Sequence, residues 1–329
     1  QLILYSAIKD RIIIEQSISE YNQTRQPLFE YFTKEIFEAE SPAIRDFLVR
    51  SSILKIMSPA DCNHILRIRN AQSLLRKIES RNLFLSAVGK NQYKYNPLFR
   101  EFLNRRLVEE SREIGELHER AARHYARRGQ WEQVVDHSLA AGNYNRAADI
   151  MLDKAGSMLA QARHDLLHEW LDRIPEEEFI RHPRLIILRG RVCHSKGLPT
   201  KANELFNQAE TTLRRDGIRK RRNQTAWIEV QFERGNLFLS EGHYQEAQRC
   251  LAKALRSCPS RPSELRGDIL NQIGLTWDGL GDLKKARHFL RRAKGQYERI
   301  KLDCATLFTD CYLTLLIEKQ GEVKILHNM

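Results

Sequence analysis

Residues 235–254 read GNLFLSEGHYQEAQRCLAKA, and four small residues in this stretch are spaced by 7, 5 and 7 positions. Two other segments repeat the order Gly, Gly, Ala, Ala at the same spacing. The three sets are Gly235, Gly242, Ala247 and Ala254; Gly190, Gly197, Ala202 and Ala209; and Gly274, Gly281, Ala286 and Ala293. Each segment is interpreted as a helix, a tight turn at the second glycine, and a second helix.

Small residues suit these positions for a physical reason. Antiparallel helices approach closely only where the facing side chains are small, and a turn glycine adopts a left-handed conformation without a steric penalty. Such units bury their apolar faces against their neighbours, which predicts an α-solenoid with a concave inner surface. Looser copies occupy Ala122, Gly129, Val134 and Ala141, and begin again at Thr314 and Gly321.

The first glycines of the units lie 45 and 39 residues apart. The pattern resembles the tetratricopeptide repeat (TPR), whose period is about 34 residues. We assign the excess to loops between units, such as residues 216–223. The predicted TPR-like sensor domain covers residues 111–329 and is truncated at its C-terminus.

Residues before about position 110 lack this repeat. A first helix is expected near residues 27–39, and three more short helices begin at capping residues, namely Ser41-Pro42, Ser58-Pro59 and Asn70. Alternating residues then indicate a β-hairpin with its turn at residues 89–91, before a helix that carries Phe99 and Phe102. Short helices followed by a hairpin describe a winged helix, which we assign to residues 27–110. Residues 1–26 are assigned as a helical connector. The predicted fold class is therefore all-α, with one small hairpin.

Composition narrows the functional classes. The 329 residues carry a net charge of +12, which raises the question of an acidic partner. No apolar stretch approaches the roughly 20 residues of a membrane span, so no membrane association is expected. Six scattered cysteines without a C-x-x-C pair favour reduced thiols and a cytoplasmic location. No nucleophile, base and metal ligands converge in the sequence, which disfavours an enzyme.

Several segments resemble the MalT-type activators of the LuxR family, which are signal-responsive NTPases of the STAND class. The resemblance rests on residues 28–39, 41–54, 82–85, 95–103, 131–148 and 182–190. It implies an order of NTPase, winged helix, TPR-like sensor and DNA-binding helix-turn-helix, of which this chain supplies the middle two. The NTPase domain of the same polypeptide is thus an implied partner, and ATP or ADP an implied cofactor of the parent.

The sequence has no G-x-x-x-x-G-K-S/T motif, begins at Gln1 without an initiator methionine and stops at Met329 inside a repeat. We therefore expect a fragment of a larger polypeptide that binds no cofactor alone. DNA would be reached only through a helix-turn-helix outside this sequence. Self-association on activation is a further expectation.

Asn96 has two interpretations. It precedes Pro97 at the start of a helix, which is typical of a plain N-cap. The resemblance offers another role, because the family usually carries a histidine at the matching position, where related NTPases contact ADP. Asparagine could hydrogen-bond a phosphate but cannot carry the charge.

The sensor surface is predicted from repeat geometry. Inner-face positions on the first helices lie one residue after and three residues before the anchor glycine, with others one turn further along. They are Ile187, Arg191, His194, Phe232, Asn236, Asn271, Leu275 and Asp278. Polar groups beside aromatic ones suit a sugar or another small inducer, and a regulatory protein is the alternative partner. Ordinary solvent-facing surface remains the simpler interpretation of any one residue.

Three other features favour structural interpretations. His164 and His168 share a helical face but lack a third metal ligand. Gly279 and Gly281 belong to a repeat turn, and the arginines near residues 214–222 are interpreted as a solvated loop. Two functions remain open: the regulatory and sensing region of a MalT-like activator, or a free-standing TPR scaffold for protein assembly.

Overall fold

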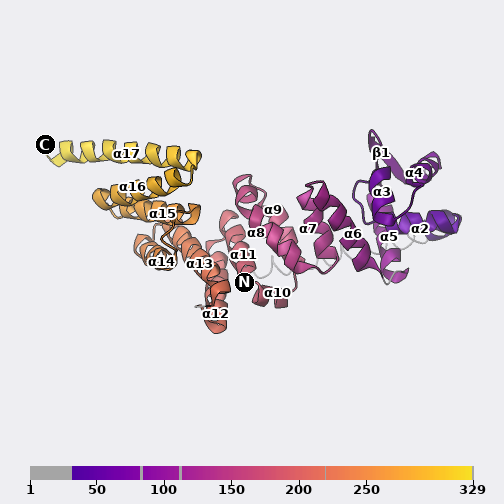
Figure 1. Cartoon of the computed structure of the whole chain (residues 1–329), viewed down its shortest axis with the longest axis horizontal. Coiled ribbons are helices and arrows are strands. Elements are labelled where there is room, and N and C mark those ends of the chain that lie inside the picture. Colours follow the sequence, from indigo (N-terminus) through magenta and orange to yellow (C-terminus); the bar gives the residue numbers. More distant parts are fainter. Residues whose placement is uncertain (1–31, 82–83, 111–112, 219, 328–329) are drawn as a thin grey trace, which may run out of the picture. The chain divides into compact units, whose positions relative to one another are not determined.

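The computed structural model describes residues 32–327 except 82–83, 111–112 and 219 (Figure 1). The proposed connector at residues 1–26 lies outside them. The chain divides into two compact units, the first ending at Ala147 and the second beginning at Ala148. No helix in the described part of the chain is both long and apolar enough to cross a membrane.

The first unit begins with short helices and a hairpin, in the predicted order. The elements are η1 (Phe32–Phe37, a π-helix), α2 (Pro42–Ser51), α3 (Pro59–Leu66), α4 (Ala71–Ser80), β1 (Leu85–Gly89), β2 (Gln92–Tyr95) and α5 (Pro97–Glu110). Leu85 pairs with Tyr95 and Ala87 with Tyr93 in the antiparallel hairpin. A bridge between Met57 and Tyr93 adds a pairing outside the hairpin that the sequence did not predict.

An aromatic core holds this part together. The rings of Phe32 and Phe99 lie 5.3 Å apart edge to face, and those of Phe99 and Phe102 lie 5.9 Å apart. Tyr95 is buried against Phe99, and its hydroxyl lies 2.8 Å from Ser51 Oγ. The hairpin is thereby joined to α2 and α5. Such aromatic contacts combine large buried area with preferred ring geometry.

The predicted caps differ in outcome. Ser58 forms the full capping box with Asp61 at the start of α3, as expected. The side chains of Ser41 and Asn70 make no cap hydrogen bond, although helices do begin after both residues. Pro42 still favours a helix start, since its fixed φ suits the first turn.

Helix pairs follow. The first pair is α6 (Ile114–Arg127) with α7 (Trp131–Ala140). Three helices come next along the chain: α8 (Tyr144–Ala160), α9 (His164–Asp172) and α10 (Glu176–Arg181). Three helical hairpins and a last helix complete the described part of the chain. These are α11 (Pro183–Ser195) with α12 (Pro199–Asp216), α13 (Arg221–Ser240) with α14 (Tyr244–Ser257), α15 (Glu264–Gly279) with α16 (Leu283–Arg299), and α17 (Asp303–His327). The turn glycines Gly197, Gly242 and Gly281 have φ of +73°, +76° and +79°, as predicted.

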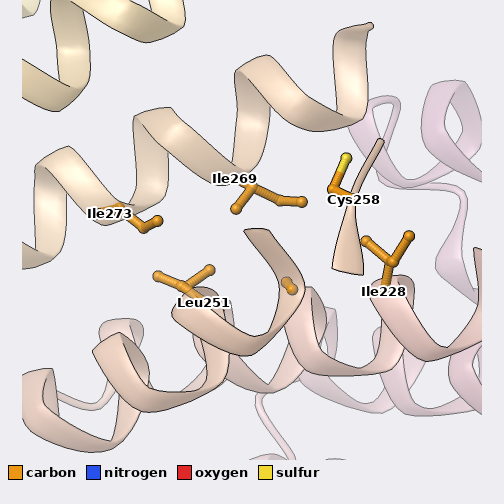
Figure 2. Close-up of a cluster of buried hydrophobic side chains, with 6 residues drawn as sticks. Ile228, Leu251, Cys258, Ile269 and Ile273 are labelled. Atoms are coloured by element: carbon orange, nitrogen blue, oxygen red, sulfur yellow. The ribbon is translucent and has the colours of Figure 1, made fainter. Parts of the chain in front are cut away.

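The core of the second unit lies between successive hairpins. One cluster joins Ile228 of α13 and Leu251 of α14 to Ile269 and Ile273 of α15. Figure 2 shows the two isoleucines of α15 pointing toward Leu251 across the space between the helices. The next cluster joins Ala286 and Leu290 of α16 to Leu316 of α17. Each hairpin thus buries its apolar face against the next one.

Two expectations about the repeat were wrong. The connection expected at residues 216–223 is shorter than predicted. Helix α12 ends at Asp216 and α13 begins at Arg221, and Asn223 is buried, donating to Asp216 Oδ2 at 2.9 Å. The excess over the usual period therefore lies in the 18 residues of α12 and the 20 of α13. In addition, α17 runs through Gly321 without a turn, because glycine permits a turn but only a packed second helix stabilises one.

Candidate functional site

The first helices of the hairpins form a row linked by polar side chains. Arg184 of α11 donates two hydrogen bonds to Glu229 of α13, at 2.8 and 2.6 Å. Further along the same two helices, Arg191 pairs with Glu233 at 3.1 Å, and His194 Nε2 lies 3.0 Å from Ser240 Oγ. The face made by α11 and α13 is therefore a ladder of charged and polar groups.

Glu233 occupies an unusual position in this ladder. Burial raises the pKa of its carboxyl, while the charge of Arg191 and a hydrogen bond from Asn236 offset part of that effect. Nearby Glu229 and Asp268 raise the pKa further. Burial also raises the pKa of Asp268, although its hydrogen bond from Tyr297, 2.7 Å long, acts in the opposite direction. Both acids therefore lie where burial disfavours the charged carboxylate, and each keeps a polar partner, Arg191 or Tyr297.

The structure brings several of the predicted sensor residues into this row. Arg191 and His194 contact α13 as described, and Asn236 lies beside Glu233. The Oδ1 atom of Asn236 is buried without a hydrogen-bond partner within the described residues. A buried amide oxygen without a donor is costly, so this atom is a candidate ligand contact.

The remaining predicted sensor residues lie outside this polar row. Asp278 accepts from Tyr312 Oη at 2.9 Å and pairs with Lys319 at 2.9 Å, which links α15 to α17. Phe232 packs against the core cluster, and Asn271 and Leu275 are half-buried. Ile187 is only 2% exposed, so its side chain packs in the interior and offers no surface to a ligand.

A hollow of about 690 Å³ lies elsewhere in the second unit, near the first turn of α11. Its lining includes His182, Arg184, Arg215, Asp216 and Asn223, and none of the predicted sensor residues. Arg184 contributes both to this hollow and, through Glu229, to the polar row. No pattern in the sequence indicated this hollow, because its lining comes from several separate helices.

Sequence reasoning also missed the acids of the row. Glu233 lies two residues before the anchor Gly235, and Asp268 six before Gly274, on the same first helices as the predicted residues. The position of Glu233, directly after the predicted Phe232, could have indicated that it belongs to the same surface. The partner of Glu233 lies one repeat away, however, and only the stacking of α11 on α13 identifies it.

Asn96 caps α5, since its Oδ1 accepts from the backbone N–H of Leu98 at 3.0 Å. The side chain is exposed, and its contact with ADP stays a prediction. His168 lies 3.5 Å from Asp172. Across the described residues, no three His, Cys, Asp or Glu side chains are placed as metal ligands.

Comparison with known proteins agrees with this architecture. Residues 33–114 match the MalT winged helix domain, and residues 228–261 match a tetratricopeptide repeat. The predicted fold class and the resemblance to MalT-like STAND proteins, with a winged helix before TPR repeats, are thereby confirmed. Both matched domain types are non-catalytic in kind.

Solved structures with a similar chain path include the following two. One is a STAND protein with a tetratricopeptide repeat sensor from Pyrococcus horikoshii, with a TM-score of 0.52 and 14% identity; the match covers 88% of this chain and 50% of that one. The other is BtubC (BKLC) from P. vanneervenii, with a TM-score of 0.37 and 14% identity, covering 66% and 91%. The chain thus spans half the length of the STAND protein, and that likeness concerns the fold.

Proposed function

We propose that this chain is the regulatory and signal-sensing region of a MalT-like, ATP-dependent transcriptional activator. The supporting observation is the combination of a MalT-type winged helix with a TPR repeat in one chain. A free-standing TPR scaffold has no need of the winged helix, so this combination favours the regulator.

The polar row on α11 and α13 is the proposed signal-binding surface. It offers a charged pair, an unpartnered amide oxygen and a carboxyl with a raised pKa, beside the half-buried ring of Phe232. Ligands with several hydroxyl groups use such mixtures of donors and acceptors next to an apolar surface. A small polar inducer, such as a sugar, is therefore the preferred signal, and a regulatory protein is the alternative.

The proposed mechanism is a shift between two states of the parent protein. The solenoid binds the inducer, and the winged helix passes the change to a neighbouring NTPase module. Such a relay requires that the inducer bind one state more tightly than the other. The coding sequence on either side should therefore encode a P-loop motif upstream and a helix-turn-helix downstream.

The binding surface is testable on the chain itself. A thermal-shift screen of sugars and other small metabolites identifies a ligand, and hydrogen exchange with that ligand maps its site. We expect protection of α11 and α13 around Arg191 and Asn236. Asn236→Ala should weaken binding about tenfold, by removal of one buried hydrogen bond, whereas Arg256→Ala on the exposed surface of α14 should leave affinity unchanged. Protection confined to α12, α14 and α16 would place the site on the other face.

A further inference from the structure

A second candidate site lies in the first unit, whereas the proposed signal-binding surface belongs to the second. A hollow of about 470 Å³ lies between the C-terminal end of α3 and one face of α6. We call it the basic hollow. Its lining is Asn63, His64, Arg67, Ile68, Arg69, Arg120, Arg123 and Arg127.

Local structure gathers the arginines. On α6, Arg120, Arg123 and Arg127 follow one another at intervals of three and four residues, which places them on one helical face. The backbone at Arg67 is left-handed, with φ of +58°, and it ends α3 as the C-cap. The chain then turns and brings Arg67 and Arg69 to the same hollow.

The positive charge of the basic hollow is only partly offset, by the charges of Glu116 and Glu113 near Arg120. No acidic residue lines it, and within the described residues none of its five arginines forms an ion pair. Arg123 Nε donates to the carbonyl oxygen of Glu119 at 3.3 Å, and Arg127 lies 3.3 Å from His64 Nε2. Arg128, the C-cap residue that follows α6, does pair with an acid, the buried Asp61. The arginines of the basic hollow therefore differ from Arg128, which has an acidic partner.

Arg120 shows most clearly the effect of gathering positive charges around the basic hollow. Its Nε is buried without a hydrogen-bond partner among the described residues. Burial lowers the pKa of its guanidinium, Glu116 raises it, and the charges of Arg67 and Arg50 lower it further. Because like charges gathered around one hollow repel one another, an anion bound there would relieve an existing cost.

We propose that the basic hollow binds a ligand with two or more phosphate groups, recognised through those phosphates. Guanidinium groups bind phosphate oxygens in a bidentate manner, and five of them around one hollow exceed what a single phosphate needs. The volume is in the range of small-molecule sites. Among the lining residues only His64 offers a ring, and its centroid lies 4.8 Å from that of His124 at an interplanar angle of 36°, so the lining holds no free platform for a base.

This shape also favours a compact ligand over nucleic acid. The arginines surround one hollow instead of following a groove, and aromatic residues that stack on bases are absent from its lining. A bound polyphosphate would contact both α3 and α6. It would thus join the winged helix to the helix pair that follows it, independently of any inducer on the solenoid.

Calorimetric titration of the full chain with inorganic tripolyphosphate tests the proposal, at constant ionic strength. We expect saturable binding that Arg123→Gln and Arg127→Gln each weaken about tenfold or more, since each removes charged hydrogen bonds to phosphate. Arg123→Lys should weaken binding too, because lysine keeps the charge but lacks the fork. Arg76→Gln, at an exposed position on α4, is the matched control and should bind as the original chain does. Circular dichroism verifies the fold of each variant.

Three results would overturn the proposal. The first is no saturable binding of tripolyphosphate, and the second is equal weakening by Arg76→Gln and Arg123→Gln, which would indicate unspecific attraction. The third is tighter binding of a short DNA or RNA oligonucleotide that depends on the same arginines. ATP that binds no more tightly than tripolyphosphate would support recognition through phosphates alone.

Discussion

The anchor glycines act at the scale of single contacts. A Cβ atom on Gly190 would lie 2.5 Å from the ring of Phe206, and on Gly235 it would lie 2.5 Å from Leu251. Each partner lies sixteen residues after its glycine, and so does Leu290 after Gly274, where the distance would be 2.6 Å. In α6 and α7 the anchor is Ala122, and the residue sixteen positions on is the smaller Ser138, both fully buried. A larger anchor thus coincides with a smaller partner, as a close-packed contact requires.

We predict that Gly274→Ala destabilises the second unit. The added methyl group would overlap Leu290, and overpacking of this kind costs about 1–3 kcal/mol. This loss should exceed the gain of roughly 1 kcal/mol that alanine brings in helix propensity. Urea unfolding followed by circular dichroism measures the difference.

Gly295→Ala is the matched control on α16. No atom lies within 4 Å of a Cβ built there, so the free energy of unfolding should stay the same or rise. Equal stability of the two variants would contradict the explanation by close contact.

At the scale of elements, a pair of histidines joins α6 to α7. The Nδ1 atoms of His118 and His137 lie 2.8 Å apart, and the ring of His137 stacks on Tyr125 at 5.5 Å. One nitrogen must donate and the other accept, so the pair requires at least one neutral imidazole. Burial lowers the pKa of His137 to about 3, and the charge of His118 adds to that effect. The hairpin is therefore built around a neutral His137.

We predict that acid weakens this hairpin. Below about pH 6.5 an unfolded chain protonates His137, but the folded chain does so only near pH 3. The unfolded state then binds more protons, so stability falls with the pH across this window, by at most about 1.4 kcal/mol per pH unit for this residue. Above that window both states are neutral, and the residue contributes no pH dependence.

Urea unfolding at about pH 7 and about pH 5 measures this effect. His137→Gln should lose less stability between the two pH values than the original chain. His288→Gln, at an exposed position on α16, should lose as much as the original chain. If the losses are equal in all three proteins, His137 does not carry the acid sensitivity.

At the scale of the whole molecule, positive charge exceeds negative charge. The 54 lysines and arginines outnumber the 42 acids, and many of the acids are already paired along the helices. Exposed ion pairs each contribute little, whereas the excess positive charge repels itself in the compact state. The basic hollow concentrates part of that excess in the first unit.

We therefore predict that moderate salt stabilises the chain. Raising sodium chloride from about 20 to about 200 mM shortens the screening length and should raise the midpoint of thermal unfolding. Tripolyphosphate at the same ionic strength should raise it more, because it binds the folded state specifically. A midpoint that falls with sodium chloride would mean that paired charges outweigh repulsion.

Much of the fold could be predicted because its signals are local. The turn glycines, the capping box at Ser58 and the alternation that ends at Tyr95 each depend on residues close in sequence. The loop expected at residues 216–223 was too long, because Asn223 joins the start of α13 to Asp216 and Gly217 through contacts that spacing does not reveal. The bridge from Met57 to Tyr93 was missed because its partners are far apart in sequence.

The candidate site was predicted less well, and the reason is distance along the chain. The spacing of the repeat correctly placed Arg191 and Asn236 on the helices of the polar row. The small residues fix how the two helices of each hairpin align, because only they allow close approach. The burial of Ile187, the pairing of Arg191 with Glu233 and the gathering of arginines from α3 and α6 depend on how separate helices stack. The order of residues alone determined which helices could touch, and tertiary packing decided which charges met, since electrostatic partners are set by distance in space.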